Sequence, residues 1–390
     1  MRPDEARDLA RLGGRAACGI EGLVEATHDA VVDEAYEAAG AVFGEAVRPI
    51  RTAHDIVARH TFFWVRNGLR AATWAGGVAA QRAAGEGRIS GFDGVRAQLA
   101  LGVLIGATGD RLTDEASVLA RGMTLREDGR DVPLRTQGLE EAYGAGRGRV
   151  VVFVHGLVET EHAWRYRSAQ RWGEPGLSYA TRLAEESDWQ PVLLRYNTGR
   201  RIGDNATALD ALLTDLVGAW SAPLREVAIV GHSMGGLVGL SALAQGDPRW
   251  TRLVRTVVTL GSPVDGAPLE RFAEALSRRA ERRGSWRWLS GLIGIRSAGV
   301  RDLHDALDHP GLPPWVKDYV VLGSIAPGGW PSASRLGDGL VPIPLGLADN
   351  TVVLSGLHHL DLLNHPRVYE RLRAWLDAHE KSSRSARTAR

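Results

Sequence analysis

The sequence predicts an α/β fold in which a mostly parallel β-sheet is covered by helices. Short apolar runs rich in valine, isoleucine and leucine alternate with longer segments in which apolar residues recur at helical spacing. The short runs are almost continuously apolar, which is typical of strands buried on both faces of a parallel sheet. Their alternation with helical segments predicts helices on both sides of that sheet.

The second half of the chain carries most of this pattern. We expect helices over 208–220 and 367–379, where apolar residues have helical periodicity. Valine-rich runs predict six strands, and they cover residues 150–156, 191–197, 226–233, 256–263, 318–324 and 350–356.

The first part of the chain has a different composition and a different pattern of apolar residues. Residues 1 to about 125 are rich in alanine, arginine and glutamate, and their apolar residues recur at helical spacing. We therefore expect an N-terminal helical region over residues 1–140. One interpretation is a helical layer packed on the main domain. The alternative is an amphipathic surface for lipid or for a partner chain, which the adjacent Phe62, Phe63 and Trp64 keep open. A glycine-rich link then leads into a domain expected over 146–380.

Composition excludes several classes of protein. The formal net charge of +1 argues against a nucleic-acid-binding protein, which usually carries a strongly basic domain. Cys18 is the only cysteine, so an internal disulfide is impossible. No signal peptide or membrane span is evident, and we expect a cytoplasmic protein, with peripheral contact to a membrane left open. The basic residues 381–390 are expected to form a solvated, disordered tail.

One connection is unusually long for an alternating fold. Residues 264–317 separate two predicted strands, and insertions of this length are usually lids or binding loops. Trp286, Trp288 and Leu289 within it are candidate substrate-binding residues. The simpler interpretation is a helical excursion packed away from any site.

Polar residues follow several of the predicted strands, and they include a serine, an aspartate and histidines. Ser233 follows a strand and precedes an apolar helical stretch, in Gly-His-Ser-Met-Gly, with Gly231 and Gly235 on either side. Small residues at these two positions allow the sharp strand-to-helix turn that exposes a nucleophilic serine. Because carboxyl ends of parallel strands meet at one edge, the other polar residues are expected beside Ser233.

A serine nucleophile needs a base and an acid that orients the base. Asp338 is the preferred acid, and Asp265 is the alternative because some related folds place the acid one strand earlier. His359 is the preferred base, and the adjacent His358 is the alternative. The tetrahedral intermediate needs amide donors, and the backbone N–H groups of Met234 and Leu157 are expected to supply them.

Several stretches together resemble a known family. VVFVHGL (151–157), GHSMGGLV (231–238), GDGLVP (337–342) and HHLDLL (358–363) occur in the order and spacing of α/β-hydrolases of the lipase/esterase type. The stretches 195–213 and 260–270 are similar to bacterial esterases that resemble GPI inositol-deacylase. The resemblance covers residues 146–378 and implies an α/β-hydrolase fold with a lid insertion after the sixth strand. It also implies catalytic roles for Ser233, Asp338 and His359.

The resemblance implies cleavage of a small-molecule or lipid carboxylic ester through an acyl-enzyme. An acyltransferase or a thioesterase with the same triad is an alternative, because the catalytic groups would be shared. A non-catalytic scaffold or membrane-surface protein on the same fold is a third possibility. We expect no cofactor, and the histidine spacing predicts no metal site. The sequence leaves the oligomeric state open.

Overall fold

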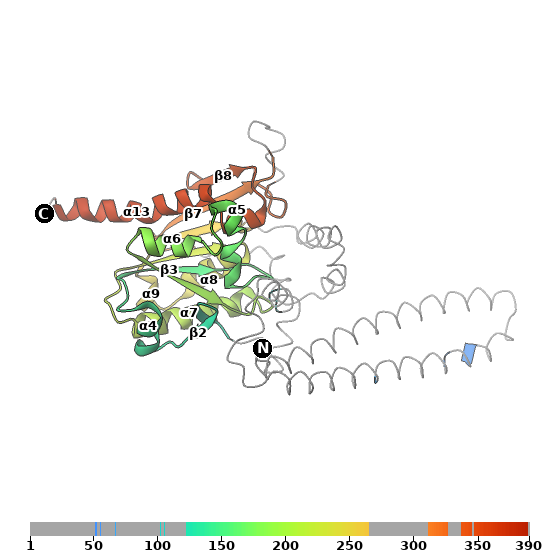
Figure 1. Ribbon diagram of the computed structural model, residues 1–390, viewed down its shortest axis with the longest axis horizontal. Coiled ribbons are helices and arrows are strands. Elements are labelled where there is room, and N and C mark those ends of the chain that lie inside the picture. The colour runs from blue at the N-terminus through green and yellow to red at the C-terminus, as the bar shows by residue number, and fades with distance from the viewer. Residues whose placement is uncertain are drawn as a thin grey trace. The chain divides into compact units, whose positions relative to one another are not determined.

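The structure is a computed structural model (Figure 1). In it the chain forms two compact units, Met1–Asp93 and Gly94–Arg390. In the first unit, Arg51 and Asp55 lie one helical turn apart, with 3.8 Å between the guanidinium and the carboxylate. The structure describes residues 122–264, 311–326, 337–344 and 347–388, together with Arg51, Thr52, Asp55, Asn67, Gly102 and Ile105. Most of the predicted N-terminal helical region and most of the predicted lid lie outside these residues.

The described part of the second unit is built on an eight-stranded sheet, with strand order β2-β1-β4-β3-β5-β6-β7-β8. In this order, every neighbouring pair of strands from β4 to the edge strand β8 is parallel. This parallel sheet confirms the predicted fold class. The strands are β1 (Thr124–Glu127), β2 (Arg130–Val132), β3 (Arg149–Val154), β4 (Trp189–Arg195), β5 (Glu226–His232), β6 (Val254–Leu260), β7 (Lys317–Ser324) and β8 (Thr351–Ser355).

The sheet begins earlier in the chain than the sequence predicts. Strands β1 and β2 lie within the expected N-terminal helical region, form an antiparallel hairpin and extend the sheet beside β4. Both strands are short and carry charged residues, such as Arg126 and Asp131, so they lack the apolar signature of the central strands. Arg126 is nevertheless buried, because Glu161 accepts a hydrogen bond of 3.0 Å from its Nε.

Helices cover both faces of the sheet (Figure 1). One face packs against α4 (Thr136–Tyr143), α7 (Ile202–Ala219), α8 (Met234–Gln245) and α9 (Pro248–Thr251). The other face packs against η3 (Glu161–Arg165), α5 (Ser168–Trp172), α6 (Tyr179–Glu186), η6 (His359–Leu363) and α13 (Pro366–Thr388). None of the helices in the described part of the chain is both long enough and apolar enough to cross a membrane.

Strand β3 shows why the central apolar runs are continuous. Val150, Val152 and Val154 belong to the core on the α7 and α8 side, whereas Val151 and Phe153 belong to the core on the α6 and α13 side. Successive side chains of a strand point to opposite faces, so both sets must be apolar when both faces are covered. Each such side chain contributes roughly 1.5–3 kcal/mol through burial.

Helix α8 begins in close contact with strand β3. A Cβ atom on Gly235 would lie 2.2 Å from the carbonyl oxygen of Val154 and 2.4 Å from that of His155. Real Cβ atoms do not approach backbone oxygens so closely, so this helix can pack here only with glycine at position 235. The first turn of α8 is thereby fixed against the carboxyl end of β3.

We therefore predict that Gly235→Ala destabilises the protein, because the new methyl group pushes α8 away from β3. The expected loss is about 1–3 kcal/mol in the free energy of unfolding, measured by urea denaturation. The matched control is Gly203→Ala in α7, where a Cβ would meet nothing within 4 Å. Alanine at this exposed helical position should be neutral or stabilise by up to about 1 kcal/mol. Equal effects of the two substitutions would contradict the packing argument.

Candidate active site

Ser233 lies at a sharp corner between β5 and α8. Its backbone has φ 51° and ψ −125°, a conformation that residues other than glycine rarely adopt. The corner is held by two hydrogen bonds, from the Ser233 N–H to the Leu260 carbonyl (2.9 Å) and from the Gly236 N–H to the Ser233 carbonyl (3.1 Å). A Cβ on Gly231 would lie 2.4 Å from the Cα of Gly236. The geometry matches the strand-to-helix turn expected from the sequence.

Asp338 and His359 meet at the same end of the sheet. Asp338 follows β7, and His359 opens η6 after β8. The Nδ1 atom of His359 lies 2.8 Å from Oδ2 of Asp338, and both side chains are almost fully buried. The other carboxylate oxygen, Oδ1, accepts hydrogen bonds of 2.9 Å from the N–H groups of Leu340 and Val341. The structure therefore brings together the acid and the base that the sequence analysis prefers.

The environment of this pair favours its ionised form. Burial raises the pKa of the Asp338 carboxyl, but the His359 ring and the two backbone donors outweigh burial, so the pKa lies below its ordinary value of 3.8. Burial lowers the pKa of His359, yet the Asp338 carboxylate and, at longer range, Glu159 raise it above 6.5. Because Nδ1 faces a carboxylate, it carries the proton in the neutral ring. Nε2 is then the basic nitrogen.

Ser233 and His359 both lie against the end of β6. The Ser233 amide bonds to Leu260, and a Cβ on the next residue, Gly261, would lie 3.1 Å from Cε1 of His359. Within the described residues, no hydrogen bond joins the Ser233 hydroxyl to the His359 ring. Catalytic hydrogen bonds of this kind are often long in ligand-free sites and shorten when a substrate is bound.

The loop that follows β3, which contains Gly156 and Leu157, also lies against Ser233. A Cβ on Gly156 would lie 3.1 Å from the Cβ of Ser233, so the loop contacts the serine directly. Val158 in this loop has φ 58°, which is strained for a β-branched residue. In the described part of the chain, the N–H groups of Leu157 and Met234 have no backbone acceptor outside α8. These are the two amides that the sequence predicts as oxyanion donors.

Two residues that the sequence analysis did not assign to the site also lie in it. Glu159 is buried beside His232, and His232 Nδ1 lies 3.0 Å from Glu159 Oε1. The sequence patterns considered above assign no role to either residue. The only local signal was an acidic residue three positions after Gly156, because the contact itself arises from the tertiary fold.

The other residues near the site, or proposed for it from the sequence, do not join the Asp338 and His359 pair in the described structure. His358 is exposed, so of the two adjacent histidines it is His359 that reaches Asp338. Asp361 accepts a hydrogen bond of 3.1 Å from the His358 N–H and one of 2.6 Å from Arg171, so its carboxylate holds the start of η6. The alternative acid Asp265 and the candidate substrate-binding residues Trp286, Trp288 and Leu289 lie outside the described residues.

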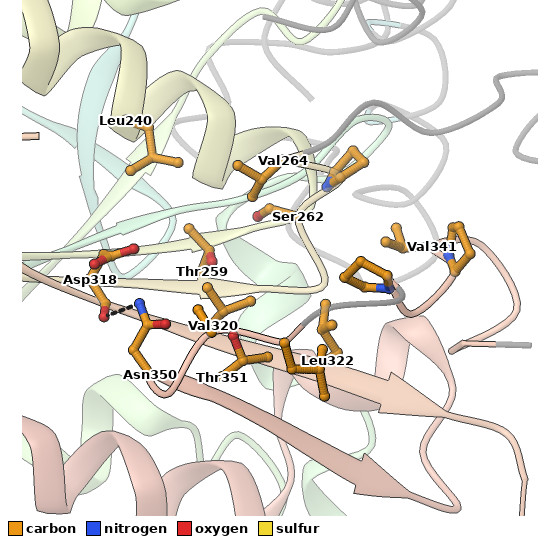
Figure 2. A pocket seen from close by; sticks show the side chains of 15 residues that line it. Leu240, Thr259, Ser262, Val264, Asp318, Val320, Leu322, Val341, Asn350 and Thr351 are labelled. Carbon is orange, nitrogen blue, oxygen red and sulfur yellow. Dashed lines mark hydrogen bonds between the residues drawn. The ribbon is translucent and has the colours of Figure 1, made fainter. Parts of the chain in front are cut away.

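A pocket of about 350 Å³ lies beside the site, on the α8 face of β6, β7 and β8 (Figure 2). Leu240, Val320, Leu322 and Val341 give it a largely apolar wall, and none of Ser233, Asp338 and His359 lines it. The pocket therefore adjoins the site through Val341 without containing the reactive groups. Among the residues that the structure describes, no cluster of three or more histidine, cysteine or acidic side chains is arranged to hold a metal ion.

Comparison with known proteins agrees with the topology. The family model of the PGAP1-like alpha/beta domain matches residues 145–287, a range that contains β3 to β6 together with Leu157, Ser233 and Met234. Asp338 and His359 lie beyond this range. The strand order, the parallel pairing and the family match identify the fold as that of an α/β-hydrolase.

Solved structures with a similar chain path include several lipases and esterases. The mature lipase BlEst2 from Bacillus licheniformis is 20% identical, with 60% of this chain and 92% of the lipase covered and a TM-score of 0.40. The esterase PF2001 from Pyrococcus furiosus is 15% identical, with 59% and 83% covered and a TM-score of 0.39. The carboxylesterase CesB from Bacillus subtilis is 16% identical, with 58% and 83% covered and a TM-score of 0.32. No curated protein matches the chain.

The pairing of Asp338 with His359 leads to a prediction about pH. In Asp338→Asn, the pKa of His359 should fall, because the charge that raises it is removed while burial remains. An NMR titration of the His359 ring, assigned with His359→Gln, measures this change. Asp349→Asn is the matched control, since Asp349 is exposed in the same part of the chain.

The same pairing predicts how stability depends on pH. The folded-state pKa of His359 is raised, so its stabilising contribution is fully present below about pH 6.5 and is lost as pH rises through the raised value. The difference in unfolding free energy between wild type and Asp338→Asn should therefore be larger at about pH 6 than at about pH 9. A difference that grows with pH would contradict the assignment.

Proposed function

We propose that this protein is a serine hydrolase that cleaves carboxylic esters through an acyl-enzyme. In this proposal Ser233 is the nucleophile, His359 is the general base and acid, and Asp338 orients His359. The amides of Leu157 and Met234 form the oxyanion hole. No cofactor takes part in the reaction.

One observation carries the proposal. Ser233 stands at a strained strand-to-helix corner, at the sheet edge where a buried carboxylate and histidine pair meets at 2.8 Å. A strained backbone conformation is retained only where the surrounding structure enforces it, and such positions are concentrated at functional sites. A buried histidine that is held by a carboxylate is a base of suitable strength for a serine hydroxyl.

In the first half of the reaction, Oγ of Ser233 attacks the ester carbonyl carbon and its proton passes to Nε2 of His359. The carbonyl oxygen becomes an oxyanion, which the N–H groups of Leu157 and Met234 stabilise. The dipole of α8, whose N-terminus lies at Met234, favours negative charge at the same place. The carbon–oxygen bond to the leaving alcohol then breaks, and the imidazolium of His359 gives that alcohol its proton.

In the second half, a water molecule attacks the acyl-enzyme carbonyl while His359 takes one of its protons. The bond between the acyl group and Oγ of Ser233 breaks, and His359 returns the proton to the serine. The acid product leaves and the neutral histidine is regenerated. Asp338 remains ionised throughout, because its role is to hold the ring and to stabilise the imidazolium.

The proposal predicts that Ser233→Ala lowers the hydrolysis of p-nitrophenyl butyrate by roughly 10⁴-fold or more, because no nucleophile remains. Initial rates measured by release of p-nitrophenol test this. The matched control is Ser241→Ala, which removes another serine from α8 about two helical turns beyond the corner and should keep wild-type activity. Ester hydrolysis by Ser233→Ala at the wild-type rate would rule out the proposed nucleophile.

A further inference from the structure

A second pair of ionisable side chains is buried next to the proposed catalytic groups. His232 is fully buried, and the Glu159 side chain is only 9% exposed. Nδ1 of His232 lies 3.0 Å from Oε1 and 3.1 Å from Oε2 of Glu159. The acyl-transfer steps proposed above use neither residue. Burying a charged pair is costly, so its presence calls for a physical role.

The other contacts of the pair reach three parts of the site. Oε2 of Glu159 accepts a hydrogen bond of 2.6 Å from the N–H of Gly156, in the loop that carries Leu157. Nε2 of His232 lies 3.2 Å from the backbone carbonyl oxygen of His359. The two histidine rings are tilted against each other with 4.7 Å between centroids. His232 itself is the residue directly before Ser233.

The His232 ring lies between two groups that can accept hydrogen bonds. Both of its ring nitrogens face acceptors, a carboxylate on one side and a carbonyl oxygen on the other. A neutral imidazole has one N–H group and can satisfy only one of these acceptors, whereas the imidazolium satisfies both. The charged form of the pair, with His232 as the cation and Glu159 as the anion, satisfies both acceptors.

The charges around the pair are consistent with this state. Burial raises the pKa of Glu159, but His232 and the Gly156 N–H outweigh burial. The pKa of the Glu159 carboxyl therefore lies below its ordinary value of 4.5. The other titratable groups that face the pair are His359 with Asp338, and His155 at the end of β3. Burial lowers the pKa of His155, which leaves that ring neutral.

We infer that Glu159 and His232 are positioning residues for the proposed esterase reaction, on which this inference rests. Their buried ion pair ties the oxyanion loop to the strand that ends at Ser233, and it holds the backbone of His359. The strained Val158 lies between Leu157 and Glu159, so without this tie the loop can relax away from Ser233. A shift of about 1 Å in such a group can cost on the order of 10²-fold in rate.

The direct test is the protonation state of His232, which does not depend on any activity. In protein labelled with ¹⁵N-histidine, the two ring nitrogens of His232 should both carry protons near neutral pH. Their signals are assigned by their loss in His232→Gln. In Glu159→Gln the ring should become neutral, because its counter-ion is gone. A neutral His232 ring in the wild-type protein would overturn the inference.

Kinetics of the same variants test the positioning role. Glu159→Gln should lower kcat for p-nitrophenyl butyrate by about 10- to 100-fold with little change in KM, because the substrate still binds while the oxyanion donor is displaced. The double variant Glu159→Gln/His232→Gln should lose little more than either single variant, since the two residues act as one unit. Glu185→Gln, an exposed glutamate in α6, is the matched control and should match wild type.

The outcomes separate this inference from the proposed function. If Ser233→Ala keeps wild-type activity, the nucleophile is wrong, whatever the state of His232. If Ser233→Ala is inactive but Glu159→Gln keeps the wild-type kcat, the esterase proposal stands and the positioning role is overturned. Circular dichroism and thermal unfolding of each variant show whether the variant is still folded, so that loss of the ion pair is distinguished from loss of the fold. The His232 signals in the wild-type protein remain decisive even where a variant fails to fold.

Discussion

The close packing of the first turn of α8 against strands β3 and β5 is the constraint on which the site depends. Gly235 lies against the carbonyl oxygens at the end of β3, and Gly231 lies against Gly236 of the helix. No side chain larger than hydrogen fits at either contact. The chain must therefore turn within one residue, and Ser233 takes the strained conformation that follows from this. Because β3, β5 and β6 are parallel, the same edge receives the loop of Leu157 and the end of β6.

Buried charge completes the arrangement that backbone packing begins. Two carboxylate and histidine pairs lie on the site, Asp338 with His359 and Glu159 with His232. Each carboxylate also accepts backbone N–H bonds, which offset the cost of burying it. The first pair sets the basicity of the proposed catalytic ring. The second pair links the loop of Leu157 to the end of β5 and to the backbone of His359. The two pairs therefore have different roles, although both consist of a carboxylate and a histidine.

The central strands and most of the candidate site could be predicted from sequence because their signals are local. Strand β3 is buried on both faces and is therefore apolar throughout, and the corner at Ser233 has glycines at fixed spacing. Strand β1 could not be found in this way, because its buried Arg126 is stabilised by the distant Glu161. The pairing of Glu159 with His232 joins residues 73 positions apart, and only the tertiary fold brings them together.

The central claim is that Ser233 is the group that attacks the ester carbonyl. The most direct measurement is mass spectrometry of the protein after reaction with a fluorophosphonate, which forms a stable bond to an activated serine. Fragmentation of the tryptic peptide 226–249 distinguishes Ser233 from Ser241. The account predicts one adduct, on Ser233, and much slower labelling of Asp338→Asn. An adduct on another residue, or no adduct on a protein that hydrolyses esters, would contradict it.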